Sequence, residues 1–158
     1  MSNKTNLFVV FIGVICLTLL VLCSNAQVEE EAPLSDICMG CLCEATSGCN
    51  QTAICNYGAC GLFRVTYAYW ADAGKLTLDN DSPDSEQAFP NCVNHPYCAA
   101  STIQNYMIRY KQDCNDDGII DCYDYAAIHR LGGYGCKGIL PPTYYEILNA
   151  CLRHHLGN

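Results

Sequence analysis

The twelve cysteines that follow residue 26 are the feature that most limits how this 158-residue chain can fold. They are Cys38, Cys41, Cys43, Cys49, Cys55, Cys60, Cys92, Cys98, Cys114, Cys122, Cys136 and Cys151. An even number of cysteines in a small secreted domain is typical of a disulfide framework, so we expect six disulfides. The spacing leaves the pairing open, although Cys41 and Cys43 must reach different partners. Zinc is the alternative, but it needs paired Cys/His spacings and reducing surroundings, which a secretory leader argues against.

Residues 1–26 have the pattern of such a leader, a signal peptide. Lys4 supplies the positive charge, residues 7–22 form an apolar run, and small residues end at Ala26. We expect cleavage after Ala26 and therefore a secreted, extracellular protein that has no membrane attachment once cleaved. The alternative is a membrane anchor, but the run is short for a span of roughly 20 residues.

The rest of the chain has the length of one domain. We expect an acidic N-terminal arm over residues 27–34 and a single domain over 35–158, which we expect to be a monomer. Loss of Lys4 with the leader leaves seven basic and sixteen acidic residues, a formal charge of −9. This balance argues against nucleic acid as a partner, because proteins that adhere to polyanions are normally basic. Sequons at Asn50 and Asn80 could carry glycans.

The pattern of apolar residues predicts an α+β domain that is mostly helical with a short antiparallel β region. Phe63, Val65, Tyr67 and Tyr69 alternate with Arg64, Thr66 and Ala68, which predicts a strand over 63–69. Residues 79–90 are expected to form a loop. Helices are predicted from Ser35 or Asp36 to Ser47, over 99–111, over 122–131 and from Thr143, where Glu146 fits a capping box.

Cysteine-anchored blocks between Ser35 and Cys151 carry a family resemblance. The blocks are Cys41-Leu42-Cys43 with Ser47-Gly48-Cys49, Cys60-Gly61, residues 69–75 (YWADAGK), residues 106–110 (YMIRY), residues 124–129 (DYAAIH), Gly132-Gly133 and Cys136. Together they resemble an invertebrate-type (i-type) lysozyme of the destabilase family. The resemblance implies a lysozyme-like fold and hydrolysis of the β-1,4 bond between N-acetylmuramic acid and N-acetylglucosamine in peptidoglycan. For some relatives it also implies isopeptidase cleavage of crosslinks.

The resemblance places the family's general-acid glutamate at Thr46, counting from Cys43. A threonine hydroxyl holds its proton too tightly to protonate a leaving oxygen near neutral pH. Glu44 is two positions away, about 200° around a helix, and is therefore expected to point away from any cleft that Thr46 faces.

The family's second carboxylate, an aspartate, lies in a wide segment between two cysteines. Here Cys55 and Cys60 enclose only Asn56-Tyr57-Gly58-Ala59, so the Asp position is deleted. Glycoside hydrolysis ordinarily needs two carboxylates, and even a substrate-assisted variant needs an acid. We therefore expect no catalytic residues in this chain. The isopeptidase serines are also missing, and Thr66 lies where relatives tend to have lysine.

Three aromatic residues are candidate contacts for a glycan: Tyr69, Trp70 and His129. Rings in a cleft can stack on sugar faces, but in a small domain they are as often core. His129 lacks the family's catalytic partners here, and a structural role is the favoured alternative to that of a base.

Residues 113–124 have the spacing of an EF-hand-type calcium loop, with Gly118 at position 6. The predicted ligands are Asp113, Asn115, Asp117, the carbonyl of Ile119, Asp121 and Asp124. We expect a structural Ca²⁺ ion and no organic cofactor. The alternative is an acidic turn, pinned by disulfides at Cys114 and Cys122, whose charges are merely solvated.

Three functions fit these observations. The first is a secreted lysozyme-fold protein that is inactive or strongly impaired and binds peptidoglycan or another N-acetylated glycan. The second is an active lysozyme, in defence against or digestion of bacteria, whose acid lies elsewhere. The third is a non-catalytic extracellular structural or interaction protein.

Overall fold

A computed structural model describes residues 32–52, 55–79 and 81–157. The predicted signal peptide, residues 27–31 of the predicted arm and Asn80 lie outside the described residues. The elements are α2 (Asp36–Ser47), β1 (Ala59–Cys60), β2 (Val65–Thr66), α3 (Tyr67–Asp72), α4 (Ala88–Asn94), α5 (Pro96–Tyr110), α6 (Cys122–Leu131) and α7 (Pro142–Leu156). The two strands pair antiparallel, with Ala59 opposite Thr66 and Cys60 opposite Val65. The predicted mostly helical α+β fold is confirmed.

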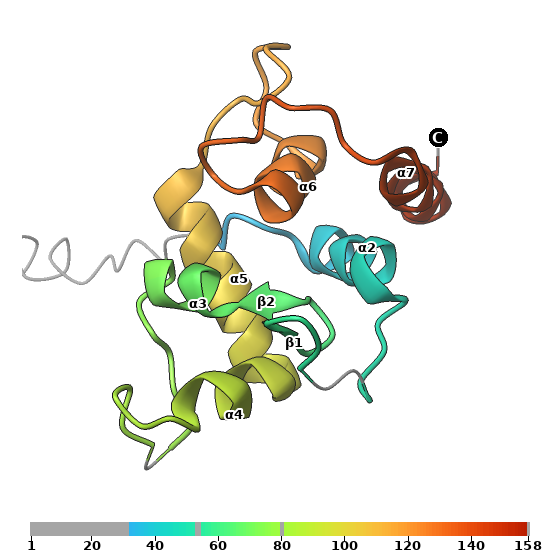
Figure 1. The fold of residues 1–158 in the computed structure, drawn as a ribbon. Coiled ribbons are helices and arrows are strands. Elements are labelled where there is room, and N and C mark those ends of the chain that lie inside the picture. The colour runs from blue at the N-terminus through green and yellow to red at the C-terminus, as the bar shows by residue number, and fades with distance from the viewer. Residues whose placement is uncertain (1–31, 53–54, 80, 158) are drawn as a thin grey trace, which may run out of the picture. The chain divides into compact units, whose positions relative to one another are not determined.

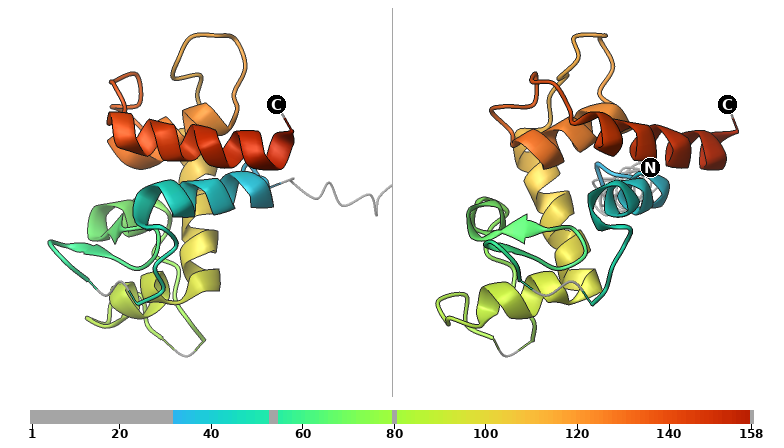
Figure 2. Two further views of the ribbon diagram at one scale, coloured as in Figure 1. Left: turned by 90° about the vertical axis from the view of Figure 1, so that its right-hand side faces the viewer. Right: turned by 45° about the vertical axis from the view of Figure 1, so that its right-hand side comes forward.

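Helix α5 passes through the middle of the domain, with the hairpin, α3 and α4 on one side of it (Figure 1). Helices α2 and α7 lie side by side (Figure 2). The core between the helices contains fully buried side chains from α2, α3, α5, α6 and α7. They include Leu42, Trp70, Ile103, Met107, Ile128 and Leu148. Across the described residues no helix is both long and apolar enough to cross a membrane.

Helix α2 begins and ends where the sequence predicts. The Ser35 hydroxyl accepts a hydrogen bond from the Cys38 N–H and caps the N-terminus. At the C-terminus Gly48 has φ 65°, a left-handed conformation that glycine adopts without steric cost. These caps fix the length of α2 and hence the position of Thr46 in its last turn.

The strand predicted over 63–69 is confirmed only at Val65–Thr66, since residues 63–64 form a turn and the strand ends at Thr66. The Thr66 hydroxyl accepts a hydrogen bond from the Tyr69 N–H at 3.3 Å, which caps a new helix instead of continuing the strand. Tyr67 and Tyr69 therefore lie on α3. The predicted loop over 79–90 also gives way to α4 at Ala88.

Two further predictions about helix and domain starts are corrected. Helix α7 begins one residue early, at Pro142, and has no side-chain cap, so the Thr143–Glu146 capping box is absent. Leu34, predicted to end the mobile arm, is buried, and its main-chain N–H and C=O both bond to the Gln104 amide. The packed domain therefore includes Leu34.

All twelve cysteines that follow residue 26 form disulfides, so none of these twelve remains as a thiolate ligand for zinc. The pairs are Cys38–Cys122, Cys41–Cys151, Cys43–Cys49, Cys55–Cys60, Cys92–Cys98 and Cys114–Cys136. Cys41 and Cys43 reach different partners, as their spacing requires. The first bridge ties α2 to the start of α6, and the second ties α2 to the C-terminal half of α7. Both helices lie far from α2 in sequence.

Candidate functional site

A cleft of about 500 Å³ lies between α2, the hairpin, α3, α5 and the end of α6. It brings together Thr46, Tyr69 and His129, three predicted site residues that lie on α2, α3 and α6. The lining residues are Thr46, Ala59, Phe63, Arg64, Thr66, Ala68, Tyr69, Asp72, Tyr106, His129, Arg130 and Gly132. The position that the resemblance assigns to a general acid therefore does face a hollow large enough for sugar rings.

Thr46 lies in the last turn of α2 and lines the cleft. Its hydroxyl oxygen is buried and makes no hydrogen bond of good geometry. The Thr46 hydroxyl interacts with the Tyr144 hydroxyl. Burial raises the pKa of Tyr144 to about 12, and the Thr46 hydroxyl lowers that pKa by a smaller amount. Glu44 is exposed and is not among the lining residues. No carboxyl group of α2 therefore reaches the cleft.

The short Cys55–Cys60 segment forms a closed turn. Asn56 and Ala59 exchange main-chain hydrogen bonds at 3.0 and 3.1 Å, and the disulfide closes the same turn. The Tyr57 side chain at its tip is almost fully exposed. Ala59 contributes to the cleft, and none of the residues that the turn encloses is acidic.

Asp72 is a cleft residue that sequence reasoning missed. It ends α3, and its carboxylate lies 3.4 Å from Arg109 Nη1 and accepts a hydrogen bond from the Tyr110 hydroxyl at 3.0 Å. Burial and this hydrogen bond raise the pKa of Tyr110 to about 12, so Tyr110 remains a donor. The available signal was the position of Asp72 inside the 69–75 block that carries the family resemblance.

Both ring nitrogens of His129, which lines the cleft, make hydrogen bonds to protein groups. Nε2 lies 3.1 Å from the Phe63 carbonyl oxygen and Nδ1 lies 3.3 Å from the Tyr69 hydroxyl. A carbonyl oxygen only accepts, so Nε2 carries the hydrogen and Nδ1 accepts from Tyr69. Desolvation by burial lowers the pKa of His129 to about 4. The ring is thus neutral at physiological pH and links the hairpin to α3.

Of the three predicted glycan contacts, Tyr69 and His129 line the cleft and Trp70 does not. Tyr69 stacks on Tyr106 with ring centroids 3.6 Å apart, and both rings face the hollow. Trp70 is 1% exposed, and its indole N–H donates to the Leu76 carbonyl at 2.7 Å. The prediction for Trp70 is therefore wrong, because its ring is buried in the core against Tyr67 and Phe89.

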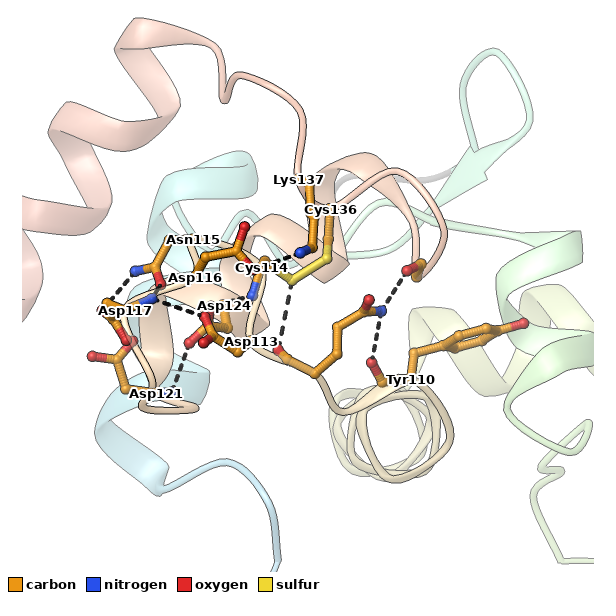
Figure 3. Close-up of a disulfide and its surroundings, with 12 residues drawn as sticks. Tyr110, Asp113, Cys114, Asn115, Asp116, Asp117, Asp121, Asp124, Cys136 and Lys137 are labelled. Carbon is orange, nitrogen blue, oxygen red and sulfur yellow. Dashed lines mark hydrogen bonds and ion pairs between the residues drawn. A yellow bond between two sulfur atoms is a disulfide. The ribbon is translucent and has the colours of Figure 1, made fainter.

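The predicted calcium loop, residues 113–124, precedes and enters α6 (Figure 3). Its side-chain oxygens accept hydrogen bonds from the loop's own main chain. Asp113 accepts from the Gly118 N–H at 2.8 Å, Asn115 from the Asp117 N–H at 3.0 Å, and Asp117 from the Ile119 N–H at 2.9 Å. These bonds give the loop a defined conformation.

Asp124, the predicted last ligand, is a buried carboxylate at the base of the loop. One of its oxygens accepts from the Cys114 N–H at 2.7 Å and the other from the Asp121 N–H at 2.8 Å. Asp121 in turn accepts from the Tyr123 N–H, so a capping box opens α6. Over the described residues no group of three or more His, Cys, Asp or Glu side chains is arranged to hold a metal ion.

A second hollow, of about 690 Å³, lies where the loop meets the starts of α6 and α7, and it shares no lining residue with the cleft. The Lys137–Asp116 ion pair and the Cys114–Cys136 disulfide stand at its edge (Figure 3). Of the two predicted sequons, Asn50 is exposed beside α2. Asn80 lies outside the described residues.

Comparisons with known proteins agree with this geometry. The Destabilase family matches residues 35–151. Invertebrate-type lysozyme 3 of Caenorhabditis elegans is 30% identical over 118 residues, which cover 72% of this chain and 84% of that protein. A lysozyme of Magallana gigas is 32% identical over 120 residues, covering 73% and 79%.

Solved structures show the same likeness. The lysozyme of Meretrix lusoria, in a crystal structure with PliI of Aeromonas hydrophila, is similar with a TM-score of 0.61 and 28% identity. That match covers 75% of this chain and 91% of the other. The lysozyme of Tapes japonica is similar with a TM-score of 0.58 and 27% identity, covering 74% and 89%.

Proposed function

Because this chain belongs to the destabilase family of invertebrate-type lysozymes, we propose that it is a secreted protein that binds peptidoglycan or another N-acetylated glycan in its cleft without cleaving it efficiently. The relatives are named as lysozymes, which supports peptidoglycan as the ligand class. The leader over residues 1–26 supports secretion.

The observation that carries this proposal is the chemistry of the cleft lining. Its residues include one carboxylate, Asp72, and a hydroxyl, Thr46, at the position of the general acid. A lysozyme must protonate the leaving oxygen and stabilise or attack the positive sugar ring, which takes two carboxyl groups. The Thr46 hydroxyl cannot do the first of these, because its proton is held too tightly near neutral pH.

The same cleft retains what is needed for binding. Tyr69 and Tyr106, which stack on each other and are largely buried, form part of its wall, and the His129 ring lies edge-on to Tyr69. Aromatic faces with a few fixed polar groups are typical of sugar sites.

Asp72 favours a second candidate, an active lysozyme that uses a different carboxylate. It lines the cleft, and relatives of this family cleave glycans by two such groups. However, Arg109 pairs with the Asp72 carboxylate and Tyr110 donates to it. These contacts already engage the Asp72 carboxylate, so Asp72 fits the role of a charge stabiliser better than that of an acid.

The test compares turnover and binding on one material. The secreted chain, Thr46→Ala and Asp72→Asn are assayed for release of reducing ends from purified peptidoglycan, and each is pulled down on the same insoluble peptidoglycan. We expect retention on the pellet and no turnover above buffer in any of the three. Glu44→Gln serves as the control for an acid outside the cleft.

Each other result points to one of the alternatives. Turnover that Asp72→Asn abolishes would establish an active lysozyme based on Asp72. Turnover that survives in Thr46→Ala and Asp72→Asn but is lost in Glu44→Gln would place the acid on the exposed face of α2. Neither turnover nor retention would leave the structural or interaction role.

A further inference from the structure

Four tyrosines form a continuous row of rings that runs from the surface of the domain to the wall of the cleft. The ring centroids of Tyr134 and Tyr110 lie 5.5 Å apart, and those of Tyr110 and Tyr106 lie 4.5 Å apart. The Tyr106 ring in turn stacks on that of Tyr69 at 3.6 Å. Tyr134 is 94% exposed, whereas the other three residues are buried. Electron exchange between aromatic rings weakens steeply with distance, so rings this close can pass an electron from one to the next.

The turn that follows α6 holds this row in place. The Gly133 N–H donates to the Tyr106 hydroxyl at 3.2 Å, and a Cβ placed on Gly133 would overlap the Tyr110 ring. Only glycine lets the main chain approach that ring so closely. The row is therefore a packed arrangement with Tyr134 at its exposed end.

The hydroxyl groups of the row differ in whether a proton acceptor lies beside them. Loss of one electron makes a phenol strongly acidic, so a phenol with an acceptor in place gives up its electron more readily. Tyr110 has such an acceptor, because its hydroxyl donates to the Asp72 carboxylate at 3.0 Å. The Tyr106 hydroxyl instead meets the Gly133 N–H, which cannot take up a proton.

Tyr69 also faces a base, since its hydroxyl lies 3.3 Å from His129 Nδ1. A proton moved to His129 would create a buried cation, and burial already lowers the pKa of that ring to about 4. A proton moved to Asp72 neutralises a carboxylate whose side chain is 41% exposed, from which the proton can pass to water. The partner of this carboxylate, Arg109, is 53% exposed, so water screens the loss of their ion pair. Tyr110 is therefore favoured over Tyr69 as the place where a radical remains.

We propose that Tyr134, Tyr110 and Asp72 form a relay that takes up one oxidising equivalent at the surface and holds it as a buried tyrosyl radical. The reaction partner is a one-electron oxidant, such as the ferryl haem of a peroxidase or another phenoxyl radical. Tyr134 first gives one electron to the oxidant and its phenolic proton to water. Tyr110 then gives one electron to the Tyr134 radical and its own proton to Asp72. Tyr134 takes back a proton from water and is restored.

The relay keeps Tyr134 from crosslinking. Two exposed tyrosyl radicals on different chains join through one ring carbon of each, and each displaced ring hydrogen moves to the phenolic oxygen, which gives dityrosine. The buried Tyr110 ring cannot meet a second chain, so a radical held there does not couple in this way. This activity is independent of the proposed glycan binding.

Flash oxidation of the secreted chain tests the relay. The oxidant is the ruthenium(III) tris-bipyridine complex, generated by a light flash in the absence of any glycan. Freeze-quench electron paramagnetic resonance measures the tyrosyl radical, and peptide mass spectrometry measures dityrosine at each exposed tyrosine. We expect a radical signal that persists after the oxidant is consumed. We also expect less dityrosine at Tyr134 than at Tyr97, an exposed tyrosine of α5 outside the row.

Three variants and a matched control locate each step. Tyr110→Phe and Asp72→Asn should each lose most of the persistent signal and raise dityrosine at Tyr134 several-fold. Tyr134→Phe should lower the yield of the signal, and it leaves the core intact because it changes an almost fully exposed side chain. Tyr97→Phe, which removes an exposed ring outside the row, is the control and should keep the parent signal. Circular dichroism of each variant confirms that the fold is kept.

Each contrary outcome overturns a named part of the relay. A parent signal that vanishes with the oxidant, or one that is unchanged in Tyr110→Phe, would overturn Tyr110 as the residue that holds the radical. A signal that is unchanged in Asp72→Asn would overturn Asp72 as the proton acceptor. A signal that Tyr134→Phe leaves unchanged, or that Tyr97→Phe lowers equally, would overturn entry at Tyr134. Retention on peptidoglycan is measured separately, so failure of the relay leaves the proposed glycan binding untouched.

Discussion

At the scale of single residues, the chemistry of His129 and Asp72 is determined by the groups that pack against them: Phe63 and Tyr69 against His129, and Arg109 and Tyr110 against Asp72. His129 was identified from its place in the 124–129 block, and its structural role follows from two hydrogen bonds to Phe63 and Tyr69. Asp72 lies in an equally visible block, yet only the packing of α3 against α5 brings it to the cleft and pairs it with Arg109. Sequence spacing predicts which face of a helix a residue occupies. It does not predict which other element that face meets.

The neutral state of His129 makes the stability of the domain depend on pH. Its pKa is lowered by burial to about 4 in the folded chain, against about 6.5 when unfolded. The unfolded chain therefore binds a proton first as the pH falls, so the free energy of unfolding should decrease between about pH 6.5 and 4. The difference between these two pKa values corresponds to at most about 3.4 kcal/mol of stability. Urea unfolding at steps of half a pH unit measures this decrease in the free energy of unfolding.

His129→Gln should flatten the profile in that window, because glutamine can still donate to the Phe63 carbonyl but cannot be protonated. His154→Gln, at the exposed end of α7, is the control and should keep the parent slope. A parent profile that is already flat from pH 6.5 to 4 would show that His129 is protonated in the folded chain as easily as in the unfolded one.

Asp124 is expected to stabilise the fold through main-chain hydrogen bonds. Its two oxygens accept from the Cys114 and Asp121 N–H groups, and the group is 1% exposed. Asp124→Asn turns an amide donor toward one of these donors and leaves it unsatisfied, at a cost of about 2–4 kcal/mol. Thermal melts of Asp124→Asn and of Asp116→Asn, an exposed loop acid, measure the difference.

The same thermal melts, run in chelator and in excess calcium, test whether the loop binds Ca²⁺. Calcium binding by the loop stays a prediction, since internal hydrogen bonds already occupy many of its side-chain oxygens. If Asp124 stabilises the fold only through its hydrogen bonds to the main chain, Asp124→Asn should lower the melting midpoint by the same amount in chelator and in excess calcium. If the melting midpoint of the parent chain does not change with calcium, the prediction of a calcium site is wrong.

At the scale of helices and strands, the segment after Phe63 shows which elements the local sequence predicts and which it does not. Alternating aromatic residues predicted one strand over 63–69, but β2 stops at Thr66, where a single hydroxyl begins α3. The capping box expected at Thr143 is absent, and one is found at Asp121 and Asp124 instead. Long amphipathic helices such as α5 were predicted well because their period repeats. Short elements depend on one cap or one tertiary contact.

Gly61 controls how the hairpin packs on α4. It has φ 70°, and a Cβ placed on it would lie 1.9 Å from the Val93 carbonyl oxygen. Neither the backbone of α4 nor that of the hairpin can yield easily, so Gly61→Ala should lower the free energy of unfolding by more than about 3 kcal/mol. Gly58→Ala is the control, since Gly58 has φ 76° with open space around it. It should cost only about 1 kcal/mol of backbone strain.

Urea unfolding of both variants gives the comparison, and binding to peptidoglycan reports on the cleft. Gly61→Ala should also weaken binding, because Ala59 and Arg64 reach the cleft from the two sides of this turn. Equal costs for the two variants would mean that the hairpin moves away from α4 without loss, and that positive φ alone accounts for the glycine.

At the scale of the whole molecule, the disulfides determine how far each part of the chain can separate from the rest. Their number follows from the sequence, but their pairing does not, because it depends on which helices lie side by side. Cys41–Cys151 spans 110 residues and joins α2 to α7, whereas Cys43–Cys49 spans six and lies at the end of α2. Two bridges that start two residues apart on one helix therefore constrain very different loops.

This contrast predicts unequal losses when each bridge is removed. In the chain-entropy description, a bridge stabilises the fold by restricting the unfolded chain, and the effect grows with the logarithm of the loop length. Replacing Cys41 and Cys151 by alanine should therefore cost about 2.5 kcal/mol more than replacing Cys43 and Cys49. Denaturation of the two double variants in the absence of reductant measures the difference. Equal losses would indicate that the other bridges already confine α7 in the unfolded chain, so that local packing rather than loop length sets the contribution of each bridge.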